Sequence, residues 1–320
     1  MGGSILGAEA IYNFLKFKIK KKFIFLNTLK SGINKKSKKN ILNLVISKSG
    51  NTLETITNLN TRKINNNFVF ITENKKNYLR KIAEKMKCEI IEHKNYIGGR
   101  YSVLSEVGML PAELMGLNEK KFKQLNYLIN NKTFINNLIK NVEGILQCVK
   151  KGKINSIILN YDEDSQSLFY WYQQLVAESL GKKSKGILPI VSQMPKDNHS
   201  MMQLYLDGPK NNFFTFFDVY NQKSEKLDKL NLLQSHSYLK NKSINDIIFA
   251  QRLATEKIFK AKKIPFRSFF VKKKNEKTLG ELFCFFILET IILGRALKVN
   301  PFDQPSVELI KKETKKILIK

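Results

Sequence analysis

Apolar residues along the chain follow two spacings, one typical of buried strands and one typical of helices. ILNLVIS (41–47) and NFVFITE (67–73) are short apolar runs rich in β-branched and aromatic residues, as expected of strands in a parallel sheet. Between such runs, segments such as NYLRKIAEKMK (77–87) place apolar residues three and four apart, which is the spacing of a helix. This alternation predicts an α/β fold of parallel sheets flanked by helices.

The alternation occurs twice, separated by a mainly helical bridge from about Asn118 to Lys153. Strands are predicted at 41–47, 67–73 and 88–93, and then at 154–161, 186–193, 211–220 and 265–271. Helices are predicted at 52–59, 77–87, 165–180, 199–206, 245–262, 276–298 and 304–318. We therefore expect two subdomains, at 1–117 and 118–320, each a three-layer α/β/α sandwich. Ligand sites in such sheets lie at the carboxyl ends of the strands.

One predicted helix, at 165–180, carries a carboxylate where its apolar stripe calls for an apolar residue. Leu168, Trp171 and Leu175 form the stripe, Glu178 is the next position, and Gly181 follows as a stop signal. Two interpretations are open from the residues alone. Glu178 either pairs with Lys182 on a solvated helix end, or faces a sheltered site where a carboxylate acts as a base.

Two glycine–serine loops precede predicted helices. The first is SKSGNT (47–52), which follows strand 41–47. Its hydroxyls and the free N–H groups of the next helix could hold a phosphate, although it lacks the spacing of a Walker loop. The simpler alternative is a turn in which Thr52 is the helix N-cap. The second loop, MGGSILG, begins at Met1 and carries little weight alone.

Composition narrows the function classes. The 320 residues are 42% hydrophobic, enough for a sizeable core, and the net charge is +29. A charge this large suggests a polyanionic partner, but Lys is spread along the chain without an Arg and aromatic patch, so no nucleic-acid partner is expected. The three cysteines have no metal-binding spacing, which predicts no metal site and a reduced, cytoplasmic compartment. We find no signal peptide.

The most apolar stretch, LFCFFILETIILG, contains Glu289 and ends just before Arg295. It is shorter than the ~20 apolar residues of a membrane span, so we interpret it as a buried helix.

Four further blocks, together with the two loops, give the chain a family resemblance. They are GGRYSVLSEVGMLP (98–111), QQLVAESLGK (173–182), QMPKDNHSMMQLYLDGP (193–209) and NPFDQPSVELIKK (300–312). In this order, and over nearly the whole chain, they resemble phosphoglucose isomerase, and the FDQP form resembles its shorter bacterial members. The resemblance implies two sugar isomerase (SIS-type) subdomains. It also implies interconversion of glucose 6-phosphate and fructose 6-phosphate without a cofactor, by a homodimer whose active site lies near the subunit interface.

The resemblance assigns roles to individual residues. Glu178 is the implied base that moves a proton between C1 and C2 through an enediol, and Arg100 would stabilise the enediolate. His199 would open the sugar ring, reaching the site from the neighbouring subunit, and Lys311 would assist at the ring oxygen, although one more lysine in a lysine-rich helix is an equally simple interpretation. The implied substrate-binding residues are Gly3, Ser4, Ser47, Lys48 (through its backbone), Ser49, Thr52, Gln174 and Gln304. His93 and His236 match no motif and are expected to be structural or to lie on the surface.

The chain departs from the family at its start, because family members normally carry a helix and a strand before the GGS loop. We expect a central strand of the first sheet to be missing and the stability to be lower than that of an extended form. Three alternative functions remain: a sugar-phosphate-binding module without catalysis, an isomerase that also accepts mannose 6-phosphate, and a basic nucleic-acid-binding protein. The co-occurrence of Glu178, Arg100, His199 and Lys311 favours catalysis over binding alone.

Overall fold

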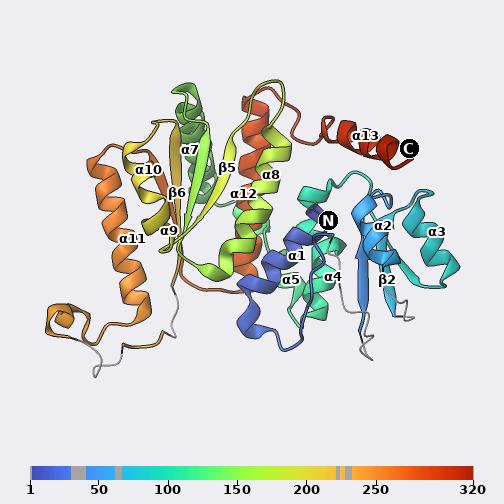
Figure 1. The fold of residues 1–320 in the computed structure, drawn as a ribbon, viewed down its shortest axis with the longest axis horizontal. Helices are drawn as coiled ribbons and strands as arrows, with labels where there is room; N and C mark the ends of the chain where they lie inside the picture. Colours follow the sequence, from blue (N-terminus) through green and yellow to red (C-terminus); the bar gives the residue numbers. More distant parts are fainter. Residues whose placement is uncertain (1, 30–40, 62–66, 221–223, 228–232, 320) are drawn as a thin grey trace.

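The first sheet is parallel and has three strands in the order β1-β2-β3 (Figure 1). The structure, a computed structural model, describes residues 2–29, 41–61, 67–220, 224–227 and 233–319. The strands are β1 (Asn43–Ile46), β2 (Phe68–Glu73) and β3 (Glu89–His93), joined by α2 (Leu53–Asn60) and α3 (Tyr78–Lys85). Phe70 and Leu79 belong to a small apolar cluster that packs α3 against this sheet. All five elements were predicted from the apolar spacing.

The second sheet is also parallel, with strand order β5-β4-β6-β7. The strands are β4 (Asn155–Asn160), β5 (Leu188–Gln193), β6 (Asn212–Val219) and β7 (Phe266–Val271). β4 and β6 pair in the middle of the sheet, and nearly all their residues are buried. Their continuous apolar sequences follow from this position, because both faces of an inner parallel strand are covered.

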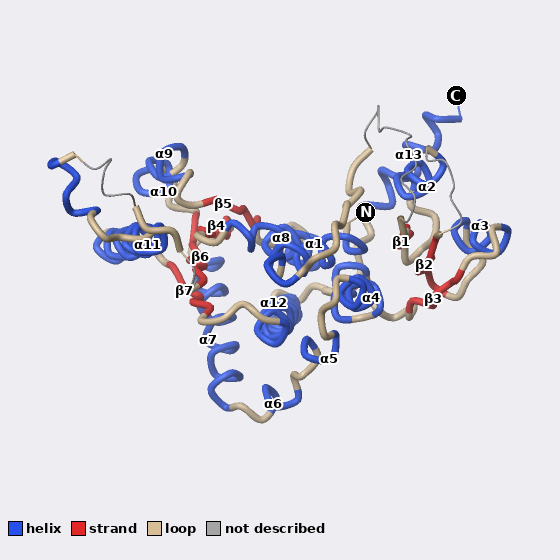
Figure 2. Tube along the Cα trace, turned by 90° about the horizontal axis from the view of Figure 1, so that it is seen from below, coloured by secondary structure: helices blue, strands red, loops and turns tan. Residues whose placement is uncertain are grey.

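A layer of helices separates the two sheets, as both ribbon views show (Figures 1 and 2). It contains α1 (Gly3–Phe14), α4 (Glu106–Leu114), α8 (Gln166–Leu180) and α12 (Glu276–Ala296). The largest apolar core lies among these helices and α7 (Lys132–Lys150), with Trp171 packed edge-on against Phe283 at a ring distance of 4.8 Å. On the other face of the second sheet lie α9 (Asp197–Ser200), α10 (Met202–Asp207) and α11 (Ile244–Ala261).

The apolar segment that contains Glu289 is a buried helix, α12, as predicted. The Glu289 carboxylate is fully buried and accepts hydrogen bonds from the Arg267 guanidinium and the Tyr172 hydroxyl. Its charge is therefore neutralised inside the core. In the described part of the chain, no helix combines the length and apolar character needed to cross a bilayer.

One part of the helical pattern differs from the prediction. The helix expected at 199–206 is divided at Met201, whose φ of −121° ends α9 before α10 begins, although the apolar spacing continues through this break. The predicted helical bridge after residue 117 consists of two short helices, α5 (Glu119–Phe122) and α6 (Asn126–Ile129), followed by α7.

The C-terminal helix, α13 (Val307–Ile319), extends beside the first sheet, near α2 in Figure 1. None of its described residues is buried, and Leu309 and Ile310 are about 70% exposed (68% and 71%). The remaining described helices are short 3₁₀ segments, at Lys16–Lys18, Gly99–Leu104, Glu163–Ser165 and Gln234–Leu239.

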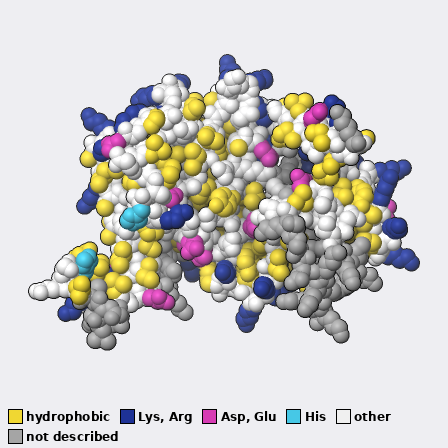
Figure 3. All heavy atoms as spheres, viewed as in Figure 1, with side chains coloured by type: hydrophobic (Ala, Val, Ile, Leu, Met, Phe, Trp, Pro, Cys, Tyr) yellow, Lys and Arg dark blue, Asp and Glu magenta, His cyan; other side chains and the backbone are white. Residues whose placement is uncertain are grey.

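Basic side chains on the face seen in Figure 3 are scattered, many of them around its rim, and do not gather into one stripe or cleft on that face.

Candidate active site

The loop SKSGNT lies at the carboxyl end of β1, where the fold predicts a ligand site. Gly50 has a φ of +63°, a conformation that favours glycine, and the Asn77 side chain occupies the space that a Cβ would need. Thr52 is at the N-cap position of α2, but its side chain does not cap the helix. Instead its hydroxyl contacts the Ser47 hydroxyl at 2.8 Å. The simple capping turn is therefore not what forms, and two hydroxyls face each other at the start of α2.

Lys48 points away from this pair of hydroxyls. Its ammonium donates to the backbone carbonyl of Asn95 at 2.6 Å. Burial lowers the pKa of Lys48, Glu73 opposes that effect, and the nearby charges of Lys75 and Arg100 lower the pKa further.

The second glycine loop packs directly against the GGRYS motif. At Gly3, the first residue of α1, an added Cβ would lie 2.2 Å from the carbonyl carbon of Gly99 and 2.5 Å from the backbone nitrogen of Arg100. Only a glycine permits this approach. Gly2, just before the helix, lies against the Gln174 side chain of α8. The N-terminus of α1 thus adjoins both Arg100 and Gln174.

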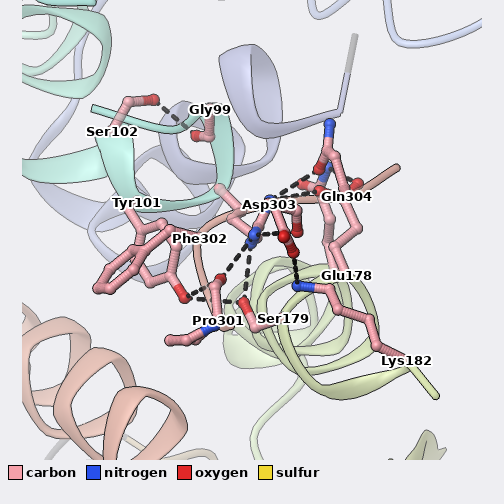
Figure 4. Close-up of polar contacts among 12 residues, drawn as sticks. Gly99, Tyr101, Ser102, Glu178, Ser179, Lys182, Pro301, Phe302, Asp303 and Gln304 are labelled. Atoms are coloured by element: carbon pink, nitrogen blue, oxygen red, sulfur yellow. Dashed lines mark hydrogen bonds and ion pairs between the residues drawn. The ribbon is translucent and has the colours of Figure 1, made fainter. Parts of the chain in front are cut away.

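Arg100 is 3% exposed and is held by acceptors from two segments of the chain, the end of α8 and the loop before α13, whose residues are labelled in Figure 4. Its Nε donates to the Ser179 Oγ at 2.8 Å. Its Nη2 donates to the backbone carbonyls of Pro301 at 2.6 Å and Asp303 at 3.1 Å. Its Nη1 donates to Gln304 Oε1 at 2.7 Å and to Glu178 Oε2 at 3.3 Å. All five N–H donors of the guanidinium therefore have an acceptor.

Glu178 lies at the C-terminal end of α8 and is partly sheltered, with its side chain 27% exposed. Gln174, one turn earlier, donates from Nε2 to Glu178 Oε1 at 2.8 Å. Lys182 does not pair with Glu178, so the helix-end ion pair considered above is absent. Lys182 binds the loop before α13 instead, through Asp303 Oδ1 at 2.8 Å and the Asn300 carbonyl. The apolar stripe of α8 therefore ends in a carboxylate because the Glu178 side chain contacts Arg100.

Two of the predicted residues lie outside this cluster. His199 is exposed on α9, on the far side of the second sheet. Lys311 is exposed on α13, where its ammonium pairs with Glu308 at 2.6 Å. Ser49 is exposed in the β1 loop, and Ser4 is partly buried in the first turn of α1. The other predicted site residues, at Gly3, Ser47, Thr52, Gln174 and Gln304, lie beside Arg100 or at the adjacent carboxyl end of β1.

His93 has a structural position, as expected for a histidine outside the motifs. It is buried, its Nδ1 contacts Glu106, and its Nε2 lies 3.1 Å from the carbonyl of Ile97. His236 is exposed. Among the described residues, no group of three or more His, Cys, Asp and Glu side chains is arranged to hold a metal ion.

Sequence reasoning did not assign a role to four residues that hold Arg100 in place. They are Tyr101, Ser179, Pro301 and Asp303. Each lies inside a quoted motif, next to or within three positions of an assigned residue. Their place in GGRYS, ESLGK and NPFDQP is a signal that could have been used.

A groove of about 990 Å³ borders the cluster on the side of Tyr101 and Phe302. Lys48 also lines it, whereas Glu178, Arg100 and Gln174 do not. Tyr101 lines the groove and also contacts the cluster, through the hydrogen bond between its hydroxyl and Ser179.

Fold and cluster together define an α/β protein with two parallel sheets whose polar site joins an arginine and a carboxylate to a serine-rich loop. The sequence pattern of the phosphoglucose isomerase family matches residues 1–320, and the chain belongs to this family.

Individual relatives support the same assignment. The glucose-6-phosphate isomerase of Mycoplasmopsis pulmonis is 35% identical, over 100% of this chain and 82% of the relative. That of Methanocaldococcus jannaschii is 32% identical, over 98% of this chain and 81% of the relative. A solved glucose-6-phosphate isomerase from Chlamydia trachomatis superposes with a TM-score of 0.80 at 20% identity, covering 99% of this chain and 68% of the other. This last likeness concerns the fold, and it confirms the predicted α/β architecture.

Proposed function

We propose that this chain is a glucose-6-phosphate isomerase that interconverts glucose 6-phosphate and fructose 6-phosphate, a step used in glycolysis and in gluconeogenesis. The observation that carries the proposal is the contact between Arg100 and Glu178, with Gln174 and Gln304 on either side. A carboxylate and a guanidinium at one site supply a base and a stabiliser of negative charge, which are the two groups that proton transfer next to a carbonyl requires.

The reaction needs a single base because one proton moves between adjacent carbons. Glu178 removes the proton from C2 of the open-chain aldose. The electrons of that C–H bond form the C1=C2 bond, and the carbonyl electrons move to O1. Arg100 stabilises the resulting enediolate. A proton passes from O2 to O1, and the carboxylic acid returns its proton to C1, which leaves the carbonyl at C2.

The phosphate and the sugar are held by the surrounding loops. The Ser47–Thr52 loop, at the N-terminus of α2, binds the phosphate through its hydroxyls and N–H groups. The residues in this role are Ser47, Lys48 through its backbone, Ser49 and Thr52. Gly3 and Ser4 lie against the sugar, and Gln174 and Gln304 orient it over the base. His199 from a neighbouring subunit opens the ring, and Lys311 assists at the ring oxygen.

The test is isomerisation of fructose 6-phosphate, measured as glucose 6-phosphate through an NADP-dependent dehydrogenase. Glu178→Gln keeps the size of the side chain but removes the base and one of its two hydrogen-bond acceptors. We expect kcat to fall by about 100- to 10,000-fold. Glu143→Gln, on the exposed face of α7, is the matched control and leaves kcat unchanged.

Two results would contradict the proposal. Wild-type chain that binds fructose 6-phosphate without turnover would favour a sugar-phosphate-binding module. Equal activity of wild type and Glu178→Gln would assign the base elsewhere. The same assay with mannose 6-phosphate determines whether the site also accepts the C2 epimer.

A further inference from the structure

The hydroxyl groups of Ser179 and Tyr101 form a closed ring of hydrogen bonds with Arg100 and the Pro301 carbonyl. The Ser179 Oγ lies 2.8 Å from the Arg100 Nε and 2.8 Å from the Tyr101 hydroxyl. The Tyr101 hydroxyl and the Arg100 Nη2 both meet the Pro301 carbonyl, at 2.9 and 2.6 Å. The ring therefore runs from Arg100 through Ser179, Tyr101 and Pro301 and back to Arg100 (Figure 4).

The direction of every hydrogen bond in this ring is determined. A carbonyl only accepts, so the single Tyr101 proton goes to Pro301. The Ser179 proton must then go to the Tyr101 oxygen, and the Ser179 oxygen accepts from the Nε–H of Arg100. Ser179 is fully buried, so water cannot replace either partner without entering the core. Each proton has one place, and no member can rotate without breaking two bonds.

This ring fixes the orientation of the guanidinium. Nε and Nη2 are engaged by the protein, so the planar group can present only Nη1 toward Glu178 and Gln304. The Arg100 guanidinium also lies 5.1 Å from the Tyr101 ring centre, which adds a cation–π contact on the same side. Because Pro301 lies three residues before Gln304, the ring also holds the loop that carries this glutamine.

We propose that Ser179 is a positioning residue for Arg100 and that Tyr101 supports it by closing the ring of hydrogen bonds. This inference rests on the proposed isomerase function, in which Arg100 stabilises the enediolate. Ser179 does not touch the reacting atoms. It determines where the Nη1 donors point, and therefore acts on the step in which negative charge develops. Loss of the Ser179 hydroxyl is expected to lower kcat more than it raises KM. Arg100 acts on the negative charge of the enediolate, whereas binding of the sugar carbons, which carry no charge, does not depend on it.

The first experiment compares Ser179→Ala with Ser165→Ala in the fructose 6-phosphate assay. Ser165 is also fully buried and donates to a carboxylate, that of Asp162, at the opposite end of the same helix. We expect Ser179→Ala to lower kcat by about 10- to 100-fold with KM changed less than about threefold. Ser165→Ala lowers the melting temperature by a similar amount and leaves kcat unchanged. A kcat for Ser179→Ala equal to that of the control overturns the positioning role.

The second experiment is a double-mutant cycle with Arg100→Lys, whose ammonium cannot make the Nε contact. If Ser179 acts through Arg100, adding Ser179→Ala to Arg100→Lys changes kcat by less than about twofold. Two multiplicative losses would overturn the inference.

Tyr101→Phe serves as an independent variant should Ser179→Ala fail to fold, because it removes only one hydroxyl. We expect kcat to fall by about three- to tenfold, less than for Ser179→Ala, since the Nε–Ser179 bond survives. An unchanged kcat in this variant counts against the ring. These outcomes are separate from failure of the proposed function, which would appear as an inactive wild-type chain.

Discussion

Two arginines, each paired with a glutamate, differ in how far solvent reaches the carboxylate of the pair. Arg100 makes its longest hydrogen bond, 3.3 Å, to its one carboxylate partner among the described residues, and Glu178 remains partly open to solvent. Arg267 binds Glu289, whose carboxylate is fully buried and also accepts from Tyr172. Solvent reaches the carboxylate of the first pair, whereas that of the second is closed off. We therefore assign Arg267–Glu289 to stability alone.

Glu289→Gln tests this structural role. The substitution removes the charge and leaves the Arg267 guanidinium buried without a counter-ion. We expect the free energy of unfolding, measured by urea denaturation, to fall by ~3–5 kcal/mol. Replacing both partners, by Arg267→Met with Glu289→Leu, recovers most of that loss, because no charge is then left unpaired. A loss below ~1 kcal/mol for Glu289→Gln would mean that water reaches the guanidinium.

At the level of elements, α1 packs closely against the GGRYS segment through two of its glycines. Gly3 begins the helix against Gly99, and Gly7, one turn later, lies against Val103. α1 therefore fits against the GGRYS segment along a strip without side chains, which places its N-terminus beside Arg100. The close fit explains why glycine is required there rather than merely tolerated in a turn.

Gly3→Ala should move α1 away from Gly99 and disturb Arg100. We expect ~1–3 kcal/mol of destabilisation from the overpacked contact, together with a lower kcat. Gly144→Ala is the matched control, because a Cβ there meets nothing within 4 Å on the exposed face of α7. It should stabilise the protein by ~0.5–1 kcal/mol and leave kcat unchanged. Unfolding and activity measurements on both variants check the prediction. Equal behaviour of the two would show that the contact at Gly3 can relax.

Apolar spacing predicted the elements well because it reports burial, which parallel sheets impose strongly on their strands. Strand 67–73 was found at Phe68–Glu73, and helix 276–298 at Glu276–Ala296. The break at Met201 was missed because it depends on one φ angle within a continuous apolar pattern. In the site, the motifs indicated Arg100 and Glu178. The Ser179–Tyr101–Pro301 ring was not predictable from spacing, since it joins three segments that only the tertiary fold brings together.

At the level of the whole molecule, the site described here lacks two of its proposed members. His199 lies exposed across the second sheet, and Lys311 lies on α13, whose Leu309 and Ile310 are also exposed. α13 also exposes Ile317, Leu318 and Ile319, and a helix with this many exposed apolar residues is typical of an interaction surface. We propose that the chain forms a homodimer in which each subunit supplies His199 to the other. Glu178, Arg100 and Gln174 already meet within one chain, so only part of the site would be shared.

Mixing two inactive variants tests this arrangement. In a mixed dimer of Glu178→Gln and His199→Ala, one site receives Glu178 from one chain and His199 from the other, and is intact. Equal random mixing makes half the dimers mixed, so about a quarter of wild-type activity should return. Mixing Glu178→Gln with Arg100→Lys is the matched control. Both residues belong to the same half of the site, so no mixed dimer has an intact site and no activity should return. If the first mixture also stays inactive while size-exclusion chromatography shows exchanged dimers, His199 does not act across the interface.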